Sequence, residues 1–429
     1  MNEIVALKNR LNNLYWLANN NRQEIFTPIE LVREMLDKLP VEVWKNPNLK
    51  WLNPASKNGV FSGEIILRLF DGLSGVISDE EKRYNHIINN MVYAYAYSKL
   101  GAWTSRKTLY GNKTVEGNVK LLDFLKEKIN MKFDLIVGNP PYQELNERGK
   151  NWGGGRKLWE EFVYKSVKVL NKNGYLCFIH PTTWRAYSDK AILKTIHQKY
   201  NSIYINLETA KKYFTVGSRF DWYILQKSKY NGNTEIESSF GKTNIKIIDW
   251  DVIPNNFCNV TKSIFIKCWD KKNKLNFKKN QTHHSYKKHI SEIKLNEFQY
   301  PIKHSIRNGN DDTILWSVKP HEIQYEKKIL ISRGGHLKPV YDRGVFGVSQ
   351  DALYMLVSSE KEANYLIRWF NSKLLKYLLI NTKFSAYHNH KCINTFPYPK
   401  NLPEDFTDDD LYKHFNLTPE EIKLVEENV

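Results

Sequence analysis

The stretch that decides the fold is residues 133–142, FDLIVGNPPY, where an apolar run meets an asparagine and two prolines. Phe133 to Val137 is rich in apolar and β-branched residues, which predicts a buried strand. Proline has no backbone N–H and cannot continue a sheet ladder, so the strand must end before Pro140. The rigid loop that follows therefore lies at a strand end, which is where open α/β sheets bind ligands.

The loop at 139–142 carries the groups that transfer to an exocyclic amine on a nucleic-acid base would need. Such an amine is a poor nucleophile, because its lone pair is delocalised into the ring. Hydrogen-bond acceptors placed on its hydrogens free that lone pair, and the Asn139 side-chain oxygen and the Pro140 carbonyl can serve as acceptors. Pro141 stiffens the loop, and Tyr142 offers a flat face on which an extruded base can stack. The alternative is a proline-rich turn without a catalytic role.

Working outward, strands alternate with helices. Thr27-Pro28-Ile29-Glu30 predicts a capping box, with Thr27 as the N-cap, and an apolar face follows as far as Leu39. The stretch 91–100 is either a strand or a buried helix. The alternation predicts a doubly wound α/β sheet. The other expected elements are a strand at 51–53 followed by a Gly59 loop and a helix to Leu69, a helix at 158–170, and strands at 174–179, 203–207 and 222–225. Nearer the C-terminus, a single helix is expected at 360–380.

Composition limits the class of protein. The 429 residues are 41% hydrophobic and 26% charged, as in a globular chain. No apolar run approaches the ~18 residues of a membrane span, and no secretory signal is visible. Cys177, Cys258, Cys268 and Cys392 are widely spaced, which argues against disulfides or a zinc ribbon and favours a cytoplasmic setting.

The chain is strongly basic. Lys and Arg number 64 against 46 Asp and Glu, a net charge of +18. Residues 261–345 hold 18 basic against 8 acidic residues, so a net +10 is concentrated there. Such an excess indicates a polyanionic partner, most often nucleic acid. The alternative is a codon bias from an AT-rich genome, since Lys, Asn, Ile and Tyr are all abundant.

With these residues in view, the chain resembles the N6-adenine DNA methyltransferases of the TaqI/Eco57I-like group, the gamma class of amino-methyltransferases, over nearly its whole length. The resemblance implies a Rossmann-like domain that binds S-adenosylmethionine (SAM), followed by a mixed α+β target recognition domain. It implies methyl transfer to a flipped-out adenine in double-stranded DNA within a restriction-modification system. A cognate restriction endonuclease or a second subunit would be the protein partner.

The resemblance also implies domain bounds and residue roles. The domains would be a methyltransferase-like catalytic domain at 1–235, a variable basic connection at 236–300, a DNA target recognition domain at 301–402 and an acidic helical tail at 403–429. Asn139, Pro140, Pro141 and Tyr142 would be catalytic, with Phe214 as the second ring of the base sandwich and Phe220 as the alternative ring. Cofactor binding would fall to Thr27, Pro28, Asn53, Pro54, Ala55, Gly59 and Asp123. Arg333, Lys338 and Arg343 would contact DNA, or form an ordinary solvated basic face.

The cofactor segment departs from the family pattern at three places. Asn53 stands where the family has an acid, and Lys57 stands where it has the first glycine. The tyrosine-rich stretch 93–98 has no acid for the ribose hydroxyls. Losing a charge-assisted contact of this kind costs about 1.5–3 kcal/mol. Two alternative functions follow: a DNA-binding pseudo-methyltransferase, or partner-dependent subunit, with impaired SAM binding, and an enzyme that transfers another group from a different donor.

Two further motifs carry weaker signals. Residues 388–392, HNHKC, would place His388, His390 and Cys392 on one face of a strand, but a DNA-facing loop is favoured over a metal site and no metal is expected. The glycines at 149–155 lack the Gly-Lys-Ser/Thr of a phosphate-binding loop, which indicates a flap beside the catalytic loop.

Overall fold

A computed structural model describes residues 2–14, 26–112, 117–144, 156–207, 209–214, 219–269, 274–306, 312–335, 337–385 and 387–429. The glycine-rich stretch 149–155 lies outside these residues. The chain divides into two compact units. Unit 1 is Met1–Trp184 with Ile192–Trp250, and unit 2 is Arg185–Ala191 with Asp251–Val429.

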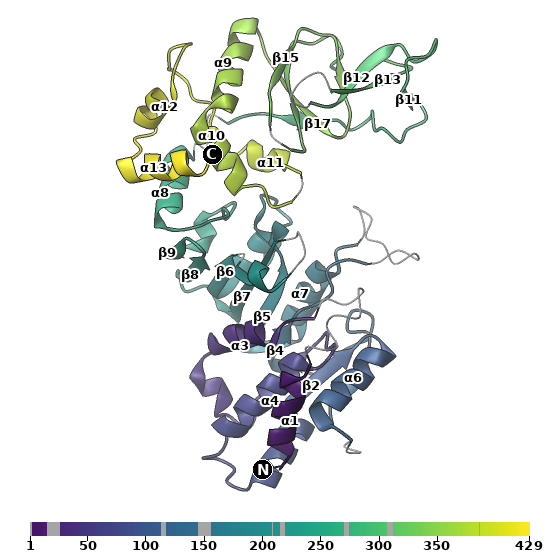
Figure 1. The fold of residues 1–429 in the computed structure, drawn as a ribbon, viewed down its shortest axis with the longest axis vertical. Helices are drawn as coiled ribbons and strands as arrows, with labels where there is room; N and C mark the ends of the chain where they lie inside the picture. The colour runs from purple at the N-terminus through teal and green to yellow at the C-terminus, as the bar shows by residue number, and fades with distance from the viewer. Residues whose placement is uncertain are drawn as a thin grey trace. The chain divides into compact units, whose positions relative to one another are not determined.

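Unit 1 is built on a nine-stranded sheet in the order β3-β2-β1-β4-β5-β7-β6-β8-β9 (Figure 1). Strands β3 to β5 along this order are parallel, and β7 is antiparallel to both of its neighbours. The alternation of strands and helices thus gives the expected doubly wound α/β fold. The strands are β1 (Trp51–Asn53), β2 (Val92–Ala96), β3 (Val119–Leu121), β4 (Phe133–Gly138), β5 (Leu170–Pro181), β6 (Tyr200–Leu207), β7 (Phe220–Lys229), β8 (Thr234–Ser238) and β9 (Gly241–Ile245).

Helices cover both faces of this sheet, because successive strand residues point to opposite sides. Leu135 and Val137 share a buried core with residues of α1, α3 and α4, whereas His180 stacks on Trp159 of α7 with ring centroids 4.4 Å apart. The helices of unit 1 are α1 (Asn2–Asn12), α3 (Ile29–Asp37), α4 (Val60–Gly72), α5 (Glu80–His86), α6 (Lys99–Tyr110) and α7 (Leu158–Val169), with short helical segments at Val41–Trp44, Ile87–Met91, Thr182–Arg185, Leu193–His197, Thr209–Tyr213 and Ile247–Asp249.

Most local expectations for unit 1 are confirmed, and one is wrong. The ambiguous stretch 91–100 forms strand β2 and the start of α6. The apolar face of α3 is buried at Val32, Met35 and Leu36. Thr27, however, does not cap α3. The N-cap position belongs to Pro28, and no side chain caps this helix, because the Thr27 hydroxyl faces a different partner.

The boundary expected at residue 235 falls within strand β8, and β9 lies beyond it. They pair with each other as an antiparallel hairpin, and β8 extends the sheet by pairing with β6. Contacts therefore keep the chain in unit 1 as far as Trp250. The hairpin is mostly polar, with Ile236 and Ile245 as its buried apolar residues, so its sequence shows little apolar periodicity.

Unit 2 contains two four-stranded sheets, in the orders β10-β17-β14-β15 and β11-β13-β12-β16. This mixed α+β composition agrees with the expected recognition domain. The strands are β10 (Lys278–Lys279), β11 (Ile290–Ser291), β12 (Tyr300–Ser305), β13 (Thr313–Ser317), β14 (Lys328–Ser332), β15 (Val340–Asp342), β16 (Gly347–Val348) and β17 (Ala352–Leu356); the helices are α8 (Asn259–Cys268), α9 (Glu360–Asn371), α10 (Lys373–Asn381), α11 (His390–Ile393), α12 (Asp408–His414) and α13 (Pro419–Glu427).

Two expectations for unit 2 need correction. The single helix expected at 360–380 is two helices, because Ser372 has extended backbone angles and its side chain caps α10 by accepting from the Leu375 amide. The stretch 388–392 includes a helical turn, α11, rather than a strand, so its three metal-ligand side chains do not share a strand face. The tail is helical as expected, and both of its helices begin with a capping box.

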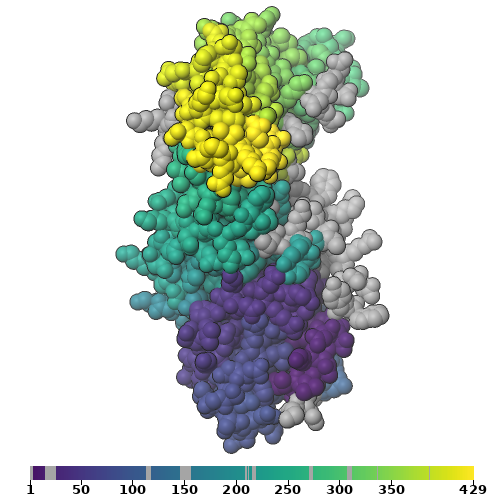
Figure 2. Space-filling view, turned by 60° about the vertical axis from the view of Figure 1, so that its left-hand side comes forward, coloured from purple at the N-terminus to yellow at the C-terminus, as the bar shows by residue number. Residues whose placement is uncertain are grey.

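Three further features are the surface of unit 2, the state of the cysteines and the length of the helices. In the space-filling view the C-terminal helices form one continuous yellow surface on unit 2 (Figure 2), where α12 and α13 pack against α10. All four cysteines are buried and free. Within the described ranges, no helix has both the length and the apolar character needed to cross a membrane.

Candidate active site

The candidate catalytic loop, residues 139–142, and the candidate cofactor loop, residues 53–59, begin at adjacent strand ends. Strands β1 and β4 are parallel neighbours, and the strand order reverses direction between them. Such a switch point opens a crevice at the carboxyl ends of the strands. The two loops also touch: a Cβ atom built on Gly138 would lie 2.9 Å from Asn53 Oδ1. Glycine at 138 therefore allows the two strand ends to approach this closely.

Asn139 is held by one hydrogen bond that leaves its acceptor unused. Its side chain is buried, and Nδ2 donates to Thr27 Oγ1 at 3.0 Å. Its Oδ1 atom is also buried, and no described residue donates to it. Buried polar atoms normally have partners, so an unpaired buried acceptor in a loop at a switch point indicates a place for a ligand donor. Thr27 thus fixes the amide with its oxygen available.

Tyr142 belongs to a row of three aromatic rings. Its ring lies 5.2 Å from Phe220 at 32°, and Phe220 lies 5.2 Å from Phe214 at 61°. Phe220 is buried, whereas Tyr142 and Phe214 are partly exposed. Burial raises the pKa of Tyr142, and the nearby Asn139 side chain opposes that shift. The phenol therefore stays neutral near pH 7, as a stacking surface requires.

Helix α3 positions both sides of this site. Thr27 precedes the helix and binds Asn139, while Glu34 within it accepts hydrogen bonds from Tyr213 Oη and from Lys212 Nζ, the latter at 3.0 Å. These contacts anchor the segment that ends in Phe214. The sequence did not reveal the contacts of Thr27 and Glu34, because their partners lie over a hundred residues away in the chain.

The cofactor loop, residues 53–59, is ordered by hydrogen bonds to β2 and α6. Asn53 Oδ1 accepts from the Ala55 amide at 3.1 Å, and the Ser56 amide donates to the Tyr95 carbonyl at 2.8 Å. Ser56 Oγ and Ser105 Oγ share a hydrogen bond of 2.8 Å. Gly59 then enters α4 with φ at +82°, a conformation that side chains rarely adopt. The loop therefore keeps the strand–turn–helix geometry of a nucleotide site.

The ribose and adenine positions are less complete. Strand β2 ends at Ala96, and the next side chains are an exposed Tyr97 and a Ser98 that caps α6 by accepting from the Gly101 amide at 3.0 Å. Asp123 follows β3, and its Oδ1 accepts from the amide of Leu125 at 3.0 Å. The scaffold fits an adenosyl cofactor, with Asp123 at the strand edge, but β2 offers no carboxylate for the ribose hydroxyls.

The three basic residues expected to contact DNA lie in unit 2 and differ in their surroundings. Arg343 forms an exposed 2.8 Å ion pair with Glu360. Arg333 donates to the Gln350 carbonyl at 3.0 Å and lies over the Tyr387 ring. Lys338 is exposed. Among the residues with described placement, no cluster of three His, Cys, Asp or Glu side chains could hold a metal.

Sequence comparisons show which proteins this chain resembles. Residues 64–214 match the family described as Eco57I restriction-modification methylase. An uncharacterized adenine-specific methylase of Mycoplasma pneumoniae is 29% identical over 324 residues, which cover 56% of this chain and 76% of that protein. The modification methylase CviBIII of Paramecium bursaria Chlorella virus NC1A is 30% identical over 171 residues, or 38% of this chain and 39% of that protein. The resemblance to adenine-specific restriction-modification methylases is therefore confirmed.

Solved structures share the fold over nearly the whole chain. A nuclease-deletion mutant of the Type ISP restriction-modification enzyme LlaGI, in complex with a DNA substrate mimic, matches 95% of this chain with a TM-score of 0.57 and 11% identity. The Type ISP enzyme LlaBIII bound to DNA matches 96% with a TM-score of 0.56 and 10% identity. This chain covers 55% of the first structure and 40% of the second.

Proposed function

We propose that this protein, a relative of the Eco57I-like restriction-modification methylases, is a site-specific DNA methyltransferase that modifies the N6 amine of a flipped-out adenine with SAM as donor. The observation that carries the proposal is the buried, unpaired Oδ1 of Asn139 beside the Tyr142 ring. An exocyclic amine can donate a hydrogen bond to that oxygen, and no described residue of the protein donates one to it.

The proposed chemistry follows from the loop. Asn139 Oδ1 and the Pro140 carbonyl accept the two N6 hydrogens and favour a pyramidal nitrogen, while Tyr142 stacks on the extruded base. Phe220 supports Tyr142 from behind, and Phe214 is the candidate for the second clamp. SAM, when bound, supplies an electrophilic methyl group. Direct transfer requires no covalent intermediate on the protein, in agreement with a loop that has no nucleophilic side chain activated by a base.

The cofactor would lie over the loop from Asn53 to Gly59. Thr27 and Pro28 would flank its methionine part. Pro54 and Ala55 would contact it through their backbone, and Asp123 would contact its adenine amine. Because β2 ends without an acid, we expect weak SAM binding to the protein alone. Ordering of the site around a flipped base would then tighten it.

The substrate would be duplex DNA. The excess of basic residues in 261–345 supports a phosphate-binding role for that region, to which Arg333 and Lys338 belong. Arg343 lies in the same region but is partly neutralised by Glu360. A restriction endonuclease or second subunit would complete the system.

Asn139→Ala tests the proposal. Loss of one positioned acceptor should reduce adenine methylation by ~10²–10³-fold, while folding and DNA affinity stay as in the wild type. Asn90→Ala is the matched control, because Asn90 is exposed and leads into the amino end of β2, whereas Asn139 follows the carboxyl end of β4. Unchanged N6-methyladenine formation by Asn139→Ala would refute the assignment.

The second candidate is a DNA-binding pseudo-methyltransferase, which the incomplete ribose position favours. Calorimetric titration of SAM, with and without duplex DNA, separates the two. An active enzyme should show binding that DNA strengthens, whereas a pseudoenzyme should show no heat at millimolar SAM in either case.

A further inference from the structure

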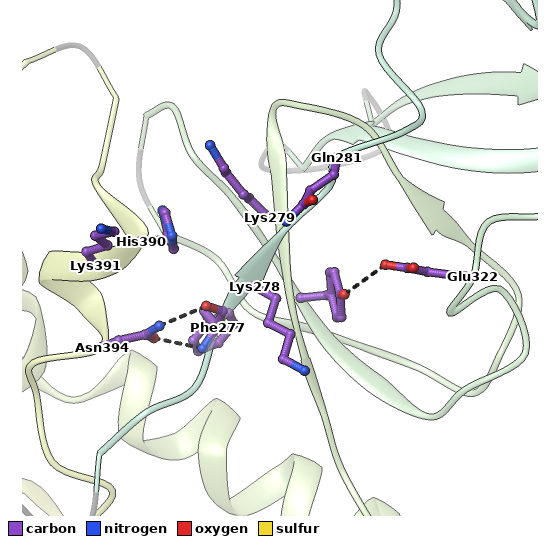
Figure 3. Close-up of a pocket in the computed structure, with 9 residues that line it drawn as sticks. Phe277, Lys278, Lys279, Gln281, Glu322, His390, Lys391 and Asn394 are labelled. Atoms are coloured by element: carbon purple, nitrogen blue, oxygen red, sulfur yellow. Dashed lines mark hydrogen bonds between the residues drawn. The ribbon is translucent and has the colours of Figure 1, made fainter.

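Unit 2 contains a basic cleft that is lined by none of Arg333, Lys338 and Arg343. The cleft has a volume of about 380 Å³ and is bounded by β10 on one side and α11 on the other (Figure 3). Asn394 holds the two sides together, because its side chain accepts from the Phe277 amide at 2.7 Å and donates to the Phe277 carbonyl at 2.8 Å. The walls of the cleft are therefore fixed by the protein itself.

Three cationic or titratable side chains meet on one side of β10. Lys278 and Lys279 are consecutive strand residues and point to opposite faces, so that only Lys279 extends to the side of His390 and Lys391 (Figure 3). Both Lys279 and Lys391 are exposed, and neither forms an ion pair with any described residue. Other lysines of unit 2, such as Lys361 and Lys373, are paired with glutamates.

The positive charges on this side of the cleft affect the pKa of His390. Burial lowers the pKa of His390, and the charges of Lys279, Arg333 and Lys391 lower it further. Three cations thus act on one imidazole from β10, from the segment after β14 and from α11. Their mutual repulsion is unfavourable unless an anion is present.

The acid of the cleft does not neutralise these cations. Among the described residues that line the cleft, Glu322 is the only acid; it lies across β10 from His390, with its carboxylate 3.5 Å from the Tyr354 hydroxyl (Figure 3). The lysine side of the cleft is therefore open to an external anion.

We propose that this cleft binds a backbone phosphate of duplex DNA, with Lys279 and Lys391 as the cations and His390 as a hydrogen-bond donor. The inference rests on the proposed function, since it names a second phosphate contact for the same substrate. A nucleic-acid phosphate is favoured over a free small anion because the cleft lies within a unit whose segment 261–345 carries a net +10 charge, which attracts a polymer more strongly than a single ion.

The test compares two full-length double variants of equal charge. Lys279→Gln with Lys391→Gln removes the proposed contacts, and Lys376→Gln with Lys400→Gln removes two exposed lysines of unit 2 that do not line the cleft. DNA affinity is measured by fluorescence anisotropy on a labelled duplex over a range of salt concentrations. Each phosphate contact contributes about 0.9 to the slope of log affinity against log salt, so the cleft variant, which loses one phosphate contact, should lose about 0.9 from the slope and about tenfold in affinity at 0.1 M salt. The control variant should lose much less.

The outcomes separate this inference from the function on which it rests. If the wild type binds no DNA at any salt, the proposed function fails. If the wild type shows a steep salt dependence and both double variants keep the same slope, the cleft assignment alone is wrong. A third measurement is the shift of melting temperature on adding inorganic phosphate. If phosphate stabilises the wild type and the control variant but not the cleft variant, and the cleft variant binds DNA as tightly as the control, the cleft is a small-anion site and the proposal is overturned. Melting temperatures of both variants that equal the wild-type value show that folding is intact.

Discussion

Replacing Thr27 by valine tests whether the orientation of Asn139 depends on a residue more than a hundred positions away. Valine has nearly the shape of threonine but lacks the hydroxyl that accepts from Asn139 Nδ2 at 3.0 Å. Because Asn139 is only 4% exposed, its amide would lose a buried hydrogen bond, at a cost of about 1–3 kcal/mol. The amide would then be able to rotate and present its nitrogen, which cannot accept, to the adenine amine.

The expected result is a fall in the single-turnover methylation rate. If most of that free energy is lost from the transition state, the rate falls by about tenfold to a hundredfold. The affinities for DNA and for SAM are measured separately, because Thr27 is also a candidate cofactor contact. Loss of rate with SAM affinity unchanged identifies a positioning role. Thr27→Ser keeps the hydroxyl and should restore most of the rate.

A double variant sharpens the conclusion. If Thr27 acts only through Asn139, adding Thr27→Val to Asn139→Ala should cause almost no further loss. A wild-type rate for Thr27→Val, or an additive loss in the double variant, would refute the coupling between the two residues.

Three other changes have defined outcomes. Asn53→Asp combined with Lys57→Gly should tighten SAM binding in calorimetry without altering DNA affinity, and only in part because the ribose acid is still missing; no change in SAM affinity would argue against the loop as the cofactor site. Gly59→Ala should lower the free energy of unfolding by roughly 1–2 kcal/mol, since Gly59 has φ +82° and the new Cβ would lie 3.2 Å from Ser105 Oγ; urea denaturation measures it, and unchanged stability would contradict the strain. Burial lowers the pKa of His180 to about 3, against about 6.5 in the unfolded chain, so between these pH values only the unfolded state takes up the proton. The free energy of unfolding should therefore fall as pH drops from 6.5 toward 3, by about 2 kcal/mol at pH 5 for this group. His180→Phe should flatten that pH dependence, and an equally steep loss in the variant would show that His180 is not its source.

Local patterns predicted the elements of unit 1 well, and failed where a side chain had two choices of partner. Thr27 fits a capping box as sequence, yet the structure gives its hydroxyl to Asn139. The run 360–380 fits one helix by periodicity, yet Ser372 caps a second helix within it. In both cases a side-chain hydroxyl can accept or donate a hydrogen bond to more than one partner, and its partner in the fold decides where a helix begins. The periodicity of apolar residues carries no information about that partner.

The sequence by itself determined where the loop 139–142 begins and which acceptor groups it contains, while the catalytic role of that loop stays a prediction. An apolar run that ends at Asn139 and two prolines can only be a buried strand entering a rigid loop, because the signals are local to that stretch. The cofactor departures at Asn53 and Lys57 are likewise visible as residue identities. The assignment of roles to Phe214 and to the basic residues stays a prediction.

Only the tertiary structure decided which distant groups meet these residues. Thr27 and Asn139 are 112 positions apart, and Lys279 and His390 are separated by a similar distance. Contacts of this kind depend on strand order and on how helices pack against the sheet, and no periodicity along the chain encodes them. The unused Asn139 oxygen and the basic cleft of unit 2 are therefore properties of the folded chain, since each arises only when segments that are distant in the sequence are brought together.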